Sequence, residues 1–292
     1  MLSGQDEETG ARVAVVQLAA TADFATIRKL VRSAIREAVS QGAEIIVLPE
    51  LATSGYSFRN RDEAELSSQP PTGGVFDDWR EDIAGSGAVV IGGFCERDDA
   101  RGNLYNSAAF VDETGVVAIH RKIHLWNKEK LIFEPGSEPP PVVETSVGKI
   151  GLAICLDIAF PEVARALALA GAELIALPVA CPDAPWPEGD YPSDVIYYRA
   201  AAQANRVFVA VSDWCGADED LRYLGWSLIV DEHGMPVAGP PPERSAGIAI
   251  ADCVLERARD KSWGAYNDLF DDRRPDLYRA RTVSSSVRAI PR

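Results

Sequence analysis

Apolar residues recur along the chain at two different spacings, and these predict strands that alternate with helices. Residues 12–18 and 43–48 are short, nearly continuous apolar runs, as buried strands are. Between them, residues 24–41 place apolar side chains three and four positions apart and stop before Gly42, which is typical of an amphipathic helix. The pattern therefore predicts an α/β protein.

The same order of elements occurs twice. In the first half we expect a further helix at residues 79–86, a strand at 88–92 and a hairpin of 107–112 with 116–120. In the second half we expect strands and helices in turn, ending in a hairpin, at residues 149–155, 161–170, 174–178, 195–205, 207–212, 227–230 and 235–238. Two similar halves of this kind predict two sheets packed face to face with helices outside.

No linker rich in Gly, Ser or Pro divides the chain, so we expect one domain over residues 1–292 with a core at about 12–250. Roughly the last 70 residues are less regular, with segments rich in Arg and Asp after Ala258. The C-terminal extension, residues 257–292, contains four aromatic residues and either crosses to a partner subunit or covers its own.

The net charge narrows the class of partner. Lys and Arg number 29 against 44 Asp and Glu, which gives a formal charge of −15 over 292 residues. Nucleic acids and anionic membranes both attract clustered Lys and Arg, so neither is expected as a partner.

The cysteines and the chain start indicate a reducing compartment. Five widely spaced cysteines without a Cys-x-x-Cys pair suggest neither a disulfide framework nor a zinc site. Residues 1–10 are polar and acidic, unlike a signal segment, and no apolar stretch approaches the about 20 residues that cross a bilayer. We expect a soluble, cytoplasmic protein.

Cys155 is the first candidate for chemistry. The apolar run 149–155 delivers its thiol to a turn before the helix at 161–170, and cysteine is a good nucleophile near neutral pH. The alternative is a structural thiol, because free cysteine is often buried as a small hydrophobe. Asp157, two residues later, is interpreted as a helix N-cap.

Three charged residues could serve such a nucleophile. Glu50 follows the strand 43–48, where a general base belongs, although it could be an exposed loop acid or a helix cap. Lys122 lies in an extended segment on the same side as His120, and its alternative is a solvated face. Glu129 has basic neighbours and could also be a plain loop acid.

Other site types have weaker support. The chain shows no Gly-x-Ser-x-Gly elbow, no phosphate loop and no Gly-x-Gly-x-x-Gly after a strand. His120 and His124 lie four residues apart without an evident matching carboxylate, so a metal site is not expected.

Three segments, in order, resemble the signatures of the nitrilase superfamily of carbon–nitrogen hydrolases. They are Leu-Pro-Glu-Leu-Ala-Thr-Ser-Gly-Tyr around Glu50, Arg-Lys-Ile-His-Leu around Lys122, and Cys-Leu-Asp with Phe-Pro-Glu after Cys155. Shorter similarities support them, including Tyr-Asn-Ser-Ala at residues 105–108. The resemblance covers about residues 12–250.

The resemblance implies a four-layer αββα sandwich of two mixed sheets that dimerises, or assembles further, through its outer helices. It implies a catalytic triad of Glu50, Lys122 and Cys155, with Glu129 nearby. Glu50 would then take the thiol proton, Lys122 and the backbone N–H of Leu156 would stabilise the oxyanion, and no metal or organic cofactor would be needed.

The residues beside Cys155 favour amides over nitriles. True nitrilases commonly carry Cys-Trp-Glu, whereas this chain has Cys-Leu-Asp, which is closer to the amidase-like branches. The segment after the strand 174–178 is stiffened by prolines and carries Trp186. We expect Trp186 to shape a small pocket with Tyr56, Trp126 and Ala180; its alternative is a surface loop with a core tryptophan.

The main hypothesis is therefore an amidase that releases ammonia from small carboxamides through a cysteine thioester. An N-carbamoyl-amine hydrolase of the same family is the alternative, although the sequence identifies no residue that would bind the far end of such a substrate. A metal-dependent phosphodiesterase and a non-catalytic interaction module are the hypotheses from other classes.

Overall fold

The computed structural model describes residues 10–21, 23–218 and 221–278, and the chain forms two compact units, Met1–Asp260 and Lys261–Arg292. The expectations about residues 1–9 and about the end of the C-terminal extension, 279–292, lie outside the described residues. None of the described helices is both long and apolar enough to cross a membrane.

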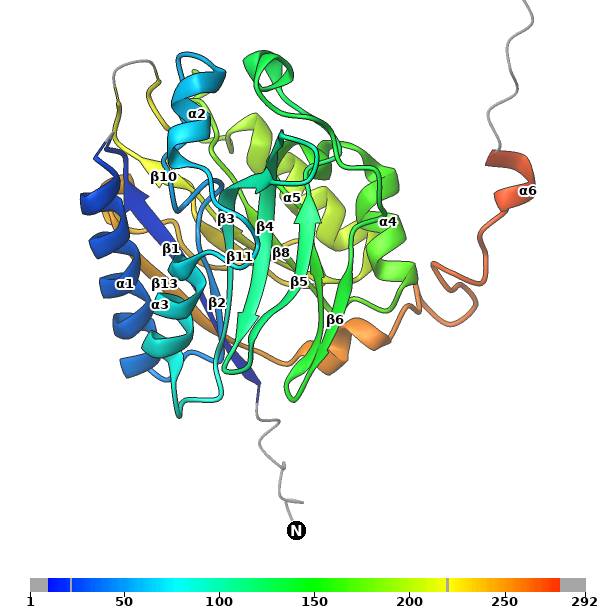
Figure 1. Cartoon of the computed structure of the whole chain (residues 1–292). Helices are drawn as coiled ribbons and strands as arrows, with labels where there is room; N and C mark the ends of the chain where they lie inside the picture. Colours follow the sequence, from blue (N-terminus) through cyan, green and yellow to red (C-terminus); the bar gives the residue numbers. More distant parts are fainter. Residues whose placement is uncertain (1–9, 22, 219–220, 279–292) are drawn as a thin grey trace, which may run out of the picture. The chain divides into compact units, whose positions relative to one another are not determined.

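The first sheet of the larger unit contains seven strands within the described residues (Figure 1). Their order is β10-β1-β2-β3-β4-β5, and β13 also pairs with β1. The β1, β2 and β3 strands are parallel, whereas β4 and β5 continue as antiparallel hairpins. The bounds are β1 Ala11–Ala19, β2 Ile45–Val47, β3 Val89–Asp98, β4 Asn103–Asp112, β5 Gly115–Arg121, β10 Trp214–Cys215 and β13 Gly247–Cys253.

The second sheet contains six strands within the described residues, in the order β12-β11-β9-β8-β7-β6. The β7, β8 and β9 strands are parallel, and the outer strands are antiparallel. The bounds are β6 Val142–Thr145, β7 Gly148–Leu152, β8 Leu174–Pro178, β9 Phe208–Ser212, β11 Leu228–Val230 and β12 Pro236–Ala238. Both sheets are mixed, and both predicted hairpins are present.

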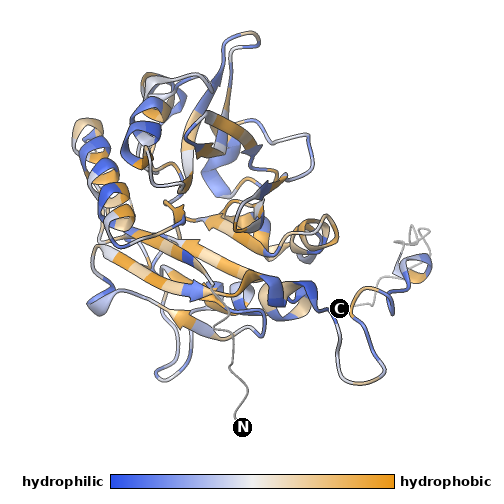
Figure 2. Ribbon diagram, turned by 90° about the horizontal axis from the view of Figure 1, so that it is seen from below, coloured by the Kyte–Doolittle hydropathy of each residue, from blue (hydrophilic) through white to orange (hydrophobic). Residues whose placement is uncertain are grey.

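Helices cover the outer face of each sheet, so the larger unit has the predicted α-β-β-α layers (Figure 1). On the first sheet lie α1, Phe24–Ser40, and α3, Gly74–Ile83, which also contact each other. On the second lie α4, Pro161–Leu169, and α5, Ser193–Asn205. In Figure 2 the strands are mainly hydrophobic, while the helices alternate between hydrophobic and hydrophilic residues.

The strands are apolar throughout because both of their faces are buried. In β1, Val13 and Val15 belong to the core between the two sheets, which includes residues of β7, β8 and β9. Their neighbours Ala14 and Val16 belong to the core between the first sheet and the helices α1 and α3. Side chains alternate across a strand, so a central strand that is covered on both faces needs a continuous apolar run.

Several predicted bounds were wrong, and several elements were missed, including the strands β6 and β10. The strand expected at 149–155 ends at Leu152, and the helix expected at 79–86 begins at Gly74. The short helix α2, Arg61–Ser67, has few apolar residues, although Asn60 caps it by accepting a hydrogen bond from the Glu63 N–H at 2.9 Å. The strand β13 lies in the region interpreted as irregular, where seven register pairs join it to β1.

The described part of the smaller unit has only local structure. Its chain folds back so that the Trp263 N–H donates to the Asn267 carbonyl at 2.7 Å and the Leu269 N–H donates to the Lys261 carbonyl at 2.9 Å. The Lys261 ammonium lies 5.0 Å from the centre of the Phe270 ring. The short helix α6, Pro275–Tyr278, follows.

Candidate active site

Glu50 lies just beyond β2, with a side chain that is 0% exposed. Its backbone is fixed from three sides. The Glu50 N–H donates to the Val179 carbonyl at 3.2 Å, and the Trp214 indole N–H donates to the Glu50 carbonyl at 2.7 Å. A Cβ on Gly93 would lie 2.1 Å from Leu51 N and 2.7 Å from Glu50 Cα, so only glycine fits beside this turn.

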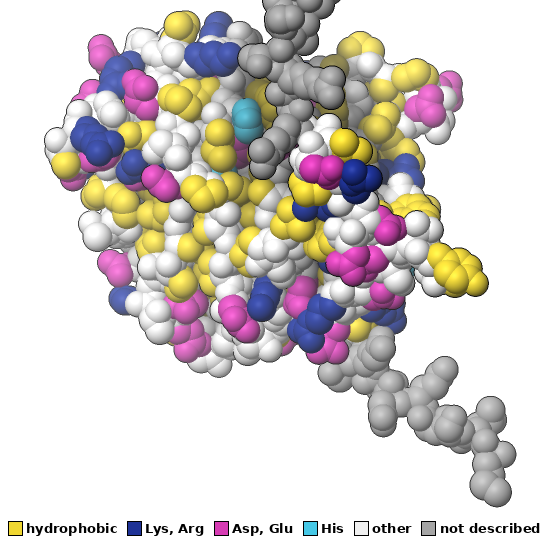
Figure 3. Space-filling model, turned by 90° about the vertical axis from the view of Figure 1, so that its right-hand side faces the viewer, with side chains coloured by type: hydrophobic (Ala, Val, Ile, Leu, Met, Phe, Trp, Pro, Cys, Tyr) yellow, Lys and Arg dark blue, Asp and Glu magenta, His cyan; other side chains and the backbone are white. Residues whose placement is uncertain are grey.

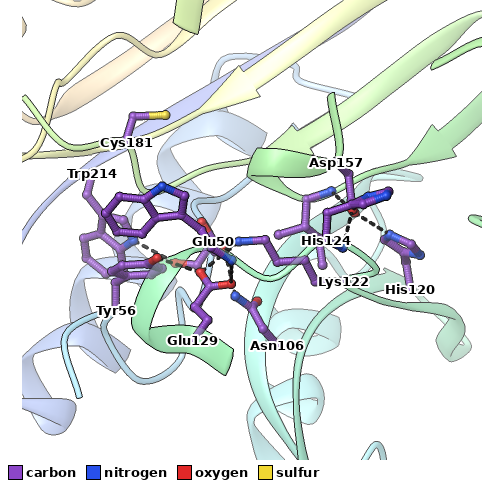
Figure 4. Close-up of polar contacts among 12 residues, drawn as sticks. Glu50, Tyr56, Asn106, His120, Lys122, His124, Glu129, Asp157, Cys181 and Trp214 are labelled. Carbon is purple, nitrogen blue, oxygen red and sulfur yellow. Dashed lines mark hydrogen bonds and ion pairs between the residues drawn. The ribbon is translucent and has the colours of Figure 1, made fainter. Parts of the chain in front are cut away.

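Lys122 follows β5 and is 1% exposed. Its N–H continues the strand pairing by donating to the Asn106 carbonyl at 2.8 Å. Its ammonium donates to Glu50 Oε1 at 2.6 Å and to Glu129 Oε1 at 2.8 Å. Glu50 lies 72 residues from Lys122 in the sequence, and the fold joins Glu50, Lys122 and Glu129 into one group, called here the inner ionic cluster (Figure 4).

Glu129 lies in the 3₁₀-helix η1, Asn127–Leu131, and both of its oxygens have partners. Oε1 accepts hydrogen bonds from the Tyr56 hydroxyl at 2.6 Å and from Lys122, while Oε2 accepts the Trp126 N–H at 2.9 Å. Glu129 is thus held as a support for the Lys122 ammonium.

The Glu50 carboxylate is arranged differently. Oε1 accepts hydrogen bonds from Lys122 and from the Asn106 side-chain amide at 2.7 Å. Oε2 is buried and has no hydrogen-bond partner among the described residues. A buried carboxylate oxygen with free lone pairs can accept a proton, as a general base must.

Burial and the charges within the inner ionic cluster together set the pKa values of Glu50 and Lys122. Burial raises the pKa of Glu50 to about 7; Lys122 opposes this rise and Glu129 adds to it. Burial lowers the pKa of Lys122, but Glu50, Cys155 and Glu129 together raise it well above its ordinary value. One ammonium shared by two carboxylates therefore stays protonated, while Glu50 can exchange a proton near neutral pH.

Cys155 begins the 3₁₀-helix η2, Cys155–Ala159, and has a φ of 46°, a left-handed conformation that is strained for a non-glycine residue. The Asp157 N–H makes the first hydrogen bond of this helix, to the Ile154 carbonyl at 2.9 Å. The Leu156 N–H lies one residue earlier, where the N–H groups of a helix have no partner within it. This turn, and not the end of β7, presents the half-buried thiol.

Cys155 opens onto a cavity of about 120 Å³, called here the inner cavity. Its lining is mainly aromatic and aliphatic, and it consists of Tyr56, Trp126, Cys155, Leu156, Ile158, Ala159, Ala180, Cys181, Pro182, Asp194, Tyr197 and Tyr198. Tyr56 joins this cavity to the inner ionic cluster through its hydrogen bond to Glu129. The predicted pocket residues Tyr56, Trp126 and Ala180 are therefore at the cavity that contains the thiol.

Trp186 is the exception among the predicted pocket residues. It lines a second and larger cavity of about 510 Å³, called here the outer cavity, which shares Pro182 and Asp194 with the inner one. Trp186 is not among the lining residues of the inner cavity, because the chain leaves that cavity after Pro182. Trp186 instead packs edge-to-face on Trp226, with ring centres 6.1 Å apart.

The surroundings keep Cys155 mainly as a thiol. A hydrogen bond with Cys181 lowers the pKa of Cys155, whereas burial and the Glu50 charge raise it, and the net shift is upward. The Lys122 charge and the Ala180 N–H also lower this pKa. The charges of Glu50 and Lys122 therefore both act on the pKa of the thiol, in opposite directions.

Asp157 connects the two histidines that the sequence left without a partner. Its carboxylate contacts His120 Nε2 at 2.9 Å and His124 Nδ1 at 2.8 Å, and it accepts the Ile154 N–H at 3.2 Å (Figure 4). The matching carboxylate that the sequence did not reveal is therefore present. Asp157 is also the third residue of η2, so its interpretation as the N-cap was wrong.

This contact fixes the turn that contains the thiol relative to the end of β5. Burial raises the pKa of Asp157, but the hydrogen bonds from His120 and His124 lower it more. The His124 ring also stacks on Phe160, with centres 3.7 Å apart and planes at 13°. Within the described residues, no group of three or more His, Cys, Asp or Glu side chains is placed to hold a metal ion.

Asn106, Asp157 and Asp194 are site residues whose roles the sequence did not indicate. Asn106 is a polar residue within a buried strand, which is a usable signal because such groups need partners. Asp157 and Asp194 each occur in a loop or first helical turn, where a carboxylate is ordinary. Only the fold shows what they face.

Comparisons with known proteins agree with this geometry. Residues 12–261 match the carbon–nitrogen hydrolase family. A nitrilase of Pyrococcus abyssi is 35% identical over 84% of this chain and 89% of its own. An N-carbamoylputrescine amidase of Solanum tuberosum is 32% identical over 91% of this chain and 93% of its own.

A solved amidase from Nesterenkonia sp. AN1 superposes with a TM-score of 0.76 and 25% identity, covering 95% of this chain and 99% of its own. That structure is a glutamate-to-glutamine mutant that shows covalent addition of the acetamide moiety of fluoroacetamide at the active-site cysteine. The present chain is a hydrolase of amide carbon–nitrogen bonds, which rules out the phosphodiesterase and interaction-module hypotheses. The chain belongs to the carbon–nitrogen hydrolase family, in the amidase-like branch of the nitrilase superfamily.

Proposed function

We propose that the protein is a cofactor-independent amidase that hydrolyses small carboxamides to a carboxylate and ammonia through a thioester on Cys155. The observation that carries the proposal is the unpartnered Glu50 Oε2 in a cluster whose charges act on the Cys155 thiol. A structural cluster would satisfy all of its buried oxygens.

In the first half of the reaction, Glu50 Oε2 accepts the Cys155 proton while the sulfur attacks the amide carbon. The Lys122 ammonium and the Leu156 N–H stabilise the oxyanion that forms. The C–N bond then breaks, Glu50 returns the proton to the departing nitrogen, and ammonia leaves the acyl group on sulfur.

In the second half, Glu50 takes a proton from water, whose oxygen attacks the thioester carbon. The C–S bond breaks, the proton returns to the sulfur, and the carboxylic acid leaves and loses its own proton to solvent as the carboxylate product. Glu129 holds the Lys122 ammonium through both steps, since neither of its oxygens is free.

An N-carbamoyl-amine hydrolase is the second candidate because of the relatives. The name of the Solanum tuberosum relative, N-carbamoylputrescine amidase, describes an N-carbamoyl substrate, and a citrullinase of Francisella tularensis is 33% identical over 91% of this chain. The chemistry at Cys155 is the same, because the carbamoyl group also has a carbonyl carbon bonded to an amide nitrogen.

Ammonia release from a panel of aliphatic amides, ω-amides and N-carbamoyl amines tests the proposal and separates the two candidates. We expect release from at least one class and none with Cys155→Ala. Release that persists in Cys155→Ala would contradict the proposed nucleophile.

We also propose a homodimer, or a higher assembly, formed through the layer of α4 and α5. Figure 3 faces this side of the molecule and shows hydrophobic side chains gathered across its middle. The α4 residue Leu169 is 45% exposed and the α5 residue Ile196 is 58% exposed. Light scattering should give a dimer mass that Leu169→Glu reduces; a monomer at micromolar concentration would contradict the proposal.

A further inference from the structure

We propose that Asp194 selects substrates whose far end carries a positive charge, so that the preferred substrate is a short amide or carbamoyl compound with a terminal ammonium. The inference rests on the proposed function and names the substrate class of that site. It assigns to Asp194 the role in binding the far end of the substrate that the sequence did not assign to any residue.

The position of Asp194 carries the inference. It lies in the first turn of α5 and lines both the inner and the outer cavity. Within the described lining of the inner cavity, Asp194 is the one carboxylate, and no Lys, Arg or His is present. A substrate whose carbonyl reaches Cys155 therefore presents its other end to a surface that carries a single negative charge.

Few groups of the protein offset the negative charge of the Asp194 carboxylate. Its side chain accepts a long hydrogen bond from the Ser193 hydroxyl at 3.4 Å and interacts with its own backbone N–H, and it forms no ion pair among the described residues. Asp183 differs, because it pairs with Arg244 at 3.2 Å. Burial raises the pKa of Asp194, which shows the cost of this half-buried carboxylate without a cation.

The helix start does not account for Asp194 by itself. An acid in the first turn of a helix complements the helix dipole, and an exposed acid would do so equally well. Here the charge of Asp194 also acts on Cys181 and Tyr198, two other lining residues of the inner cavity. Asp194 therefore contributes its charge to the cavity that holds the nucleophile, whose lining it shares.

The surrounding rings also suit a cation. Tyr56, Trp126 and Tyr197 line the inner cavity with Asp194, and aromatic faces attract ammonium groups. Over the whole chain the charge of −15 favours the approach of cations.

Arg199 sets a limit on substrate length. It lines the outer cavity, where its guanidinium lies 4.6 Å from the centre of the Tyr191 ring and its Nε donates to the Gly234 carbonyl at 2.8 Å. A longer substrate would carry its ammonium past Asp194 and toward this fixed positive charge. We therefore expect a preference for short chains.

The test compares substrates that differ only at the far end. One series consists of N-carbamoyl derivatives of an α,ω-diamine, an n-alkylamine and an ω-amino acid of equal chain length, and a second consists of the corresponding carboxamides. We expect kcat/KM for the ammonium compound to exceed that of the alkyl compound by about tenfold or more, as a charged hydrogen bond implies. The carboxylate compound should be the poorest substrate.

Two variants locate the effect. Asp194→Asn should reduce the ammonium-to-alkyl ratio of kcat/KM to about one. Asp190→Asn is the matched control, because Asp190 is an exposed acid that lines only the outer cavity, and it should keep the wild-type ratio.

The outcomes separate this inference from the proposed function. Equal wild-type rates for ammonium and alkyl compounds, or a ratio that Asp194→Asn does not change, would overturn the role of Asp194 and leave the amidase proposal standing. Absence of ammonia release from both series would overturn the amidase proposal and this inference with it.

Discussion

Two clusters of ion pairs in this molecule contain the same kind of contact, but we assign them different roles. The first is the inner ionic cluster of Glu50, Lys122 and Glu129. The second, called here the helix ionic cluster, joins arginines of α1 to acids of α3, and its members are Arg28, Arg32, Arg36, Asp78, Glu81 and Asp82.

The two clusters differ in charge balance and in access to solvent. The helix ionic cluster has three cations and three anions, and the Arg36 side chain is 59% exposed. Its carboxylates share several bonds, including Arg32 to Asp82 at 2.7 Å. The inner ionic cluster has one cation for two anions, and the Lys122 side chain is 0% exposed.

The comparison indicates how the cluster to which we assign catalysis differs from a structural group of charges. Bond lengths do not distinguish the two clusters. The helix ionic cluster contains a contact of 2.7 Å, and the inner ionic cluster contains contacts of 2.6 and 2.8 Å. The inner ionic cluster alone combines an excess of negative charge, an oxygen without a partner and a thiol on which both signs act. A protein keeps such an arrangement where a proton has to move.

The two clusters should differ most in the loss of stability and activity that follows removal of one cation from each. Lys122→Met leaves two buried carboxylates unpaired, so we expect the free energy of unfolding to fall by about 3–5 kcal/mol and activity to be lost. The loss of stability should shrink at low pH, where the carboxylates are protonated. Denaturant unfolding at two pH values measures both effects.

Arg36→Met is the matched control in the helix ionic cluster. It removes an exposed partner of Asp82, which keeps Arg32, so we expect a loss of about 1 kcal/mol or less and unchanged activity. Equal losses in the two variants would contradict the distinction between the clusters.

A second difference concerns protonation. Burial raises the pKa of Glu50 to about 7, and a general base works when it is deprotonated. The kcat/KM of the wild type should therefore rise with pH through about 7 and fall below it. Glu50→Gln should lower the rate about 10²–10⁴-fold and remove this limb of the profile. A limb that persists in Glu50→Gln would assign the titration to another group.

A smaller effect on activity is expected from a change at Asp157. This residue positions the turn of Cys155 and is not among the residues that line the inner cavity. Asp157→Asn keeps the size of the side chain but cannot accept from both His120 and His124 with full charge. We expect kcat to fall about tenfold, the loss of one charged hydrogen bond, with KM changed little. A change confined to KM would contradict the positioning role.

The sequence predicted most of the fold because its central strands carry their own signal. Continuous apolar runs identified β1 and β8, since burial on both faces leaves no alternative pattern. The strand β13 was missed because most of its residues are only partly buried and its place depends on pairing with β1. The helix α2 is mostly polar, so its cap was the only available signal.

For the site, the sequence indicated the residues but not their contacts. Glu50, Lys122 and Cys155 stood out by strand position and by resemblance, yet which oxygen of Glu50 is free depends on Asn106, a partner 56 residues away. The link from Asp157 to two histidines and the place of Asp194 at the cavity arise from packing between distant segments. No local spacing encodes such contacts.

The central claim is that Cys155 forms a covalent acyl intermediate. Rapid acid quenching during turnover of an amide panel, followed by intact mass spectrometry and peptide mapping, tests it most directly. We predict an adduct equal to the amide minus ammonia on the peptide that contains Cys155, and none in Cys155→Ala. An adduct on a different residue, or full turnover by Cys155→Ala, would contradict the account.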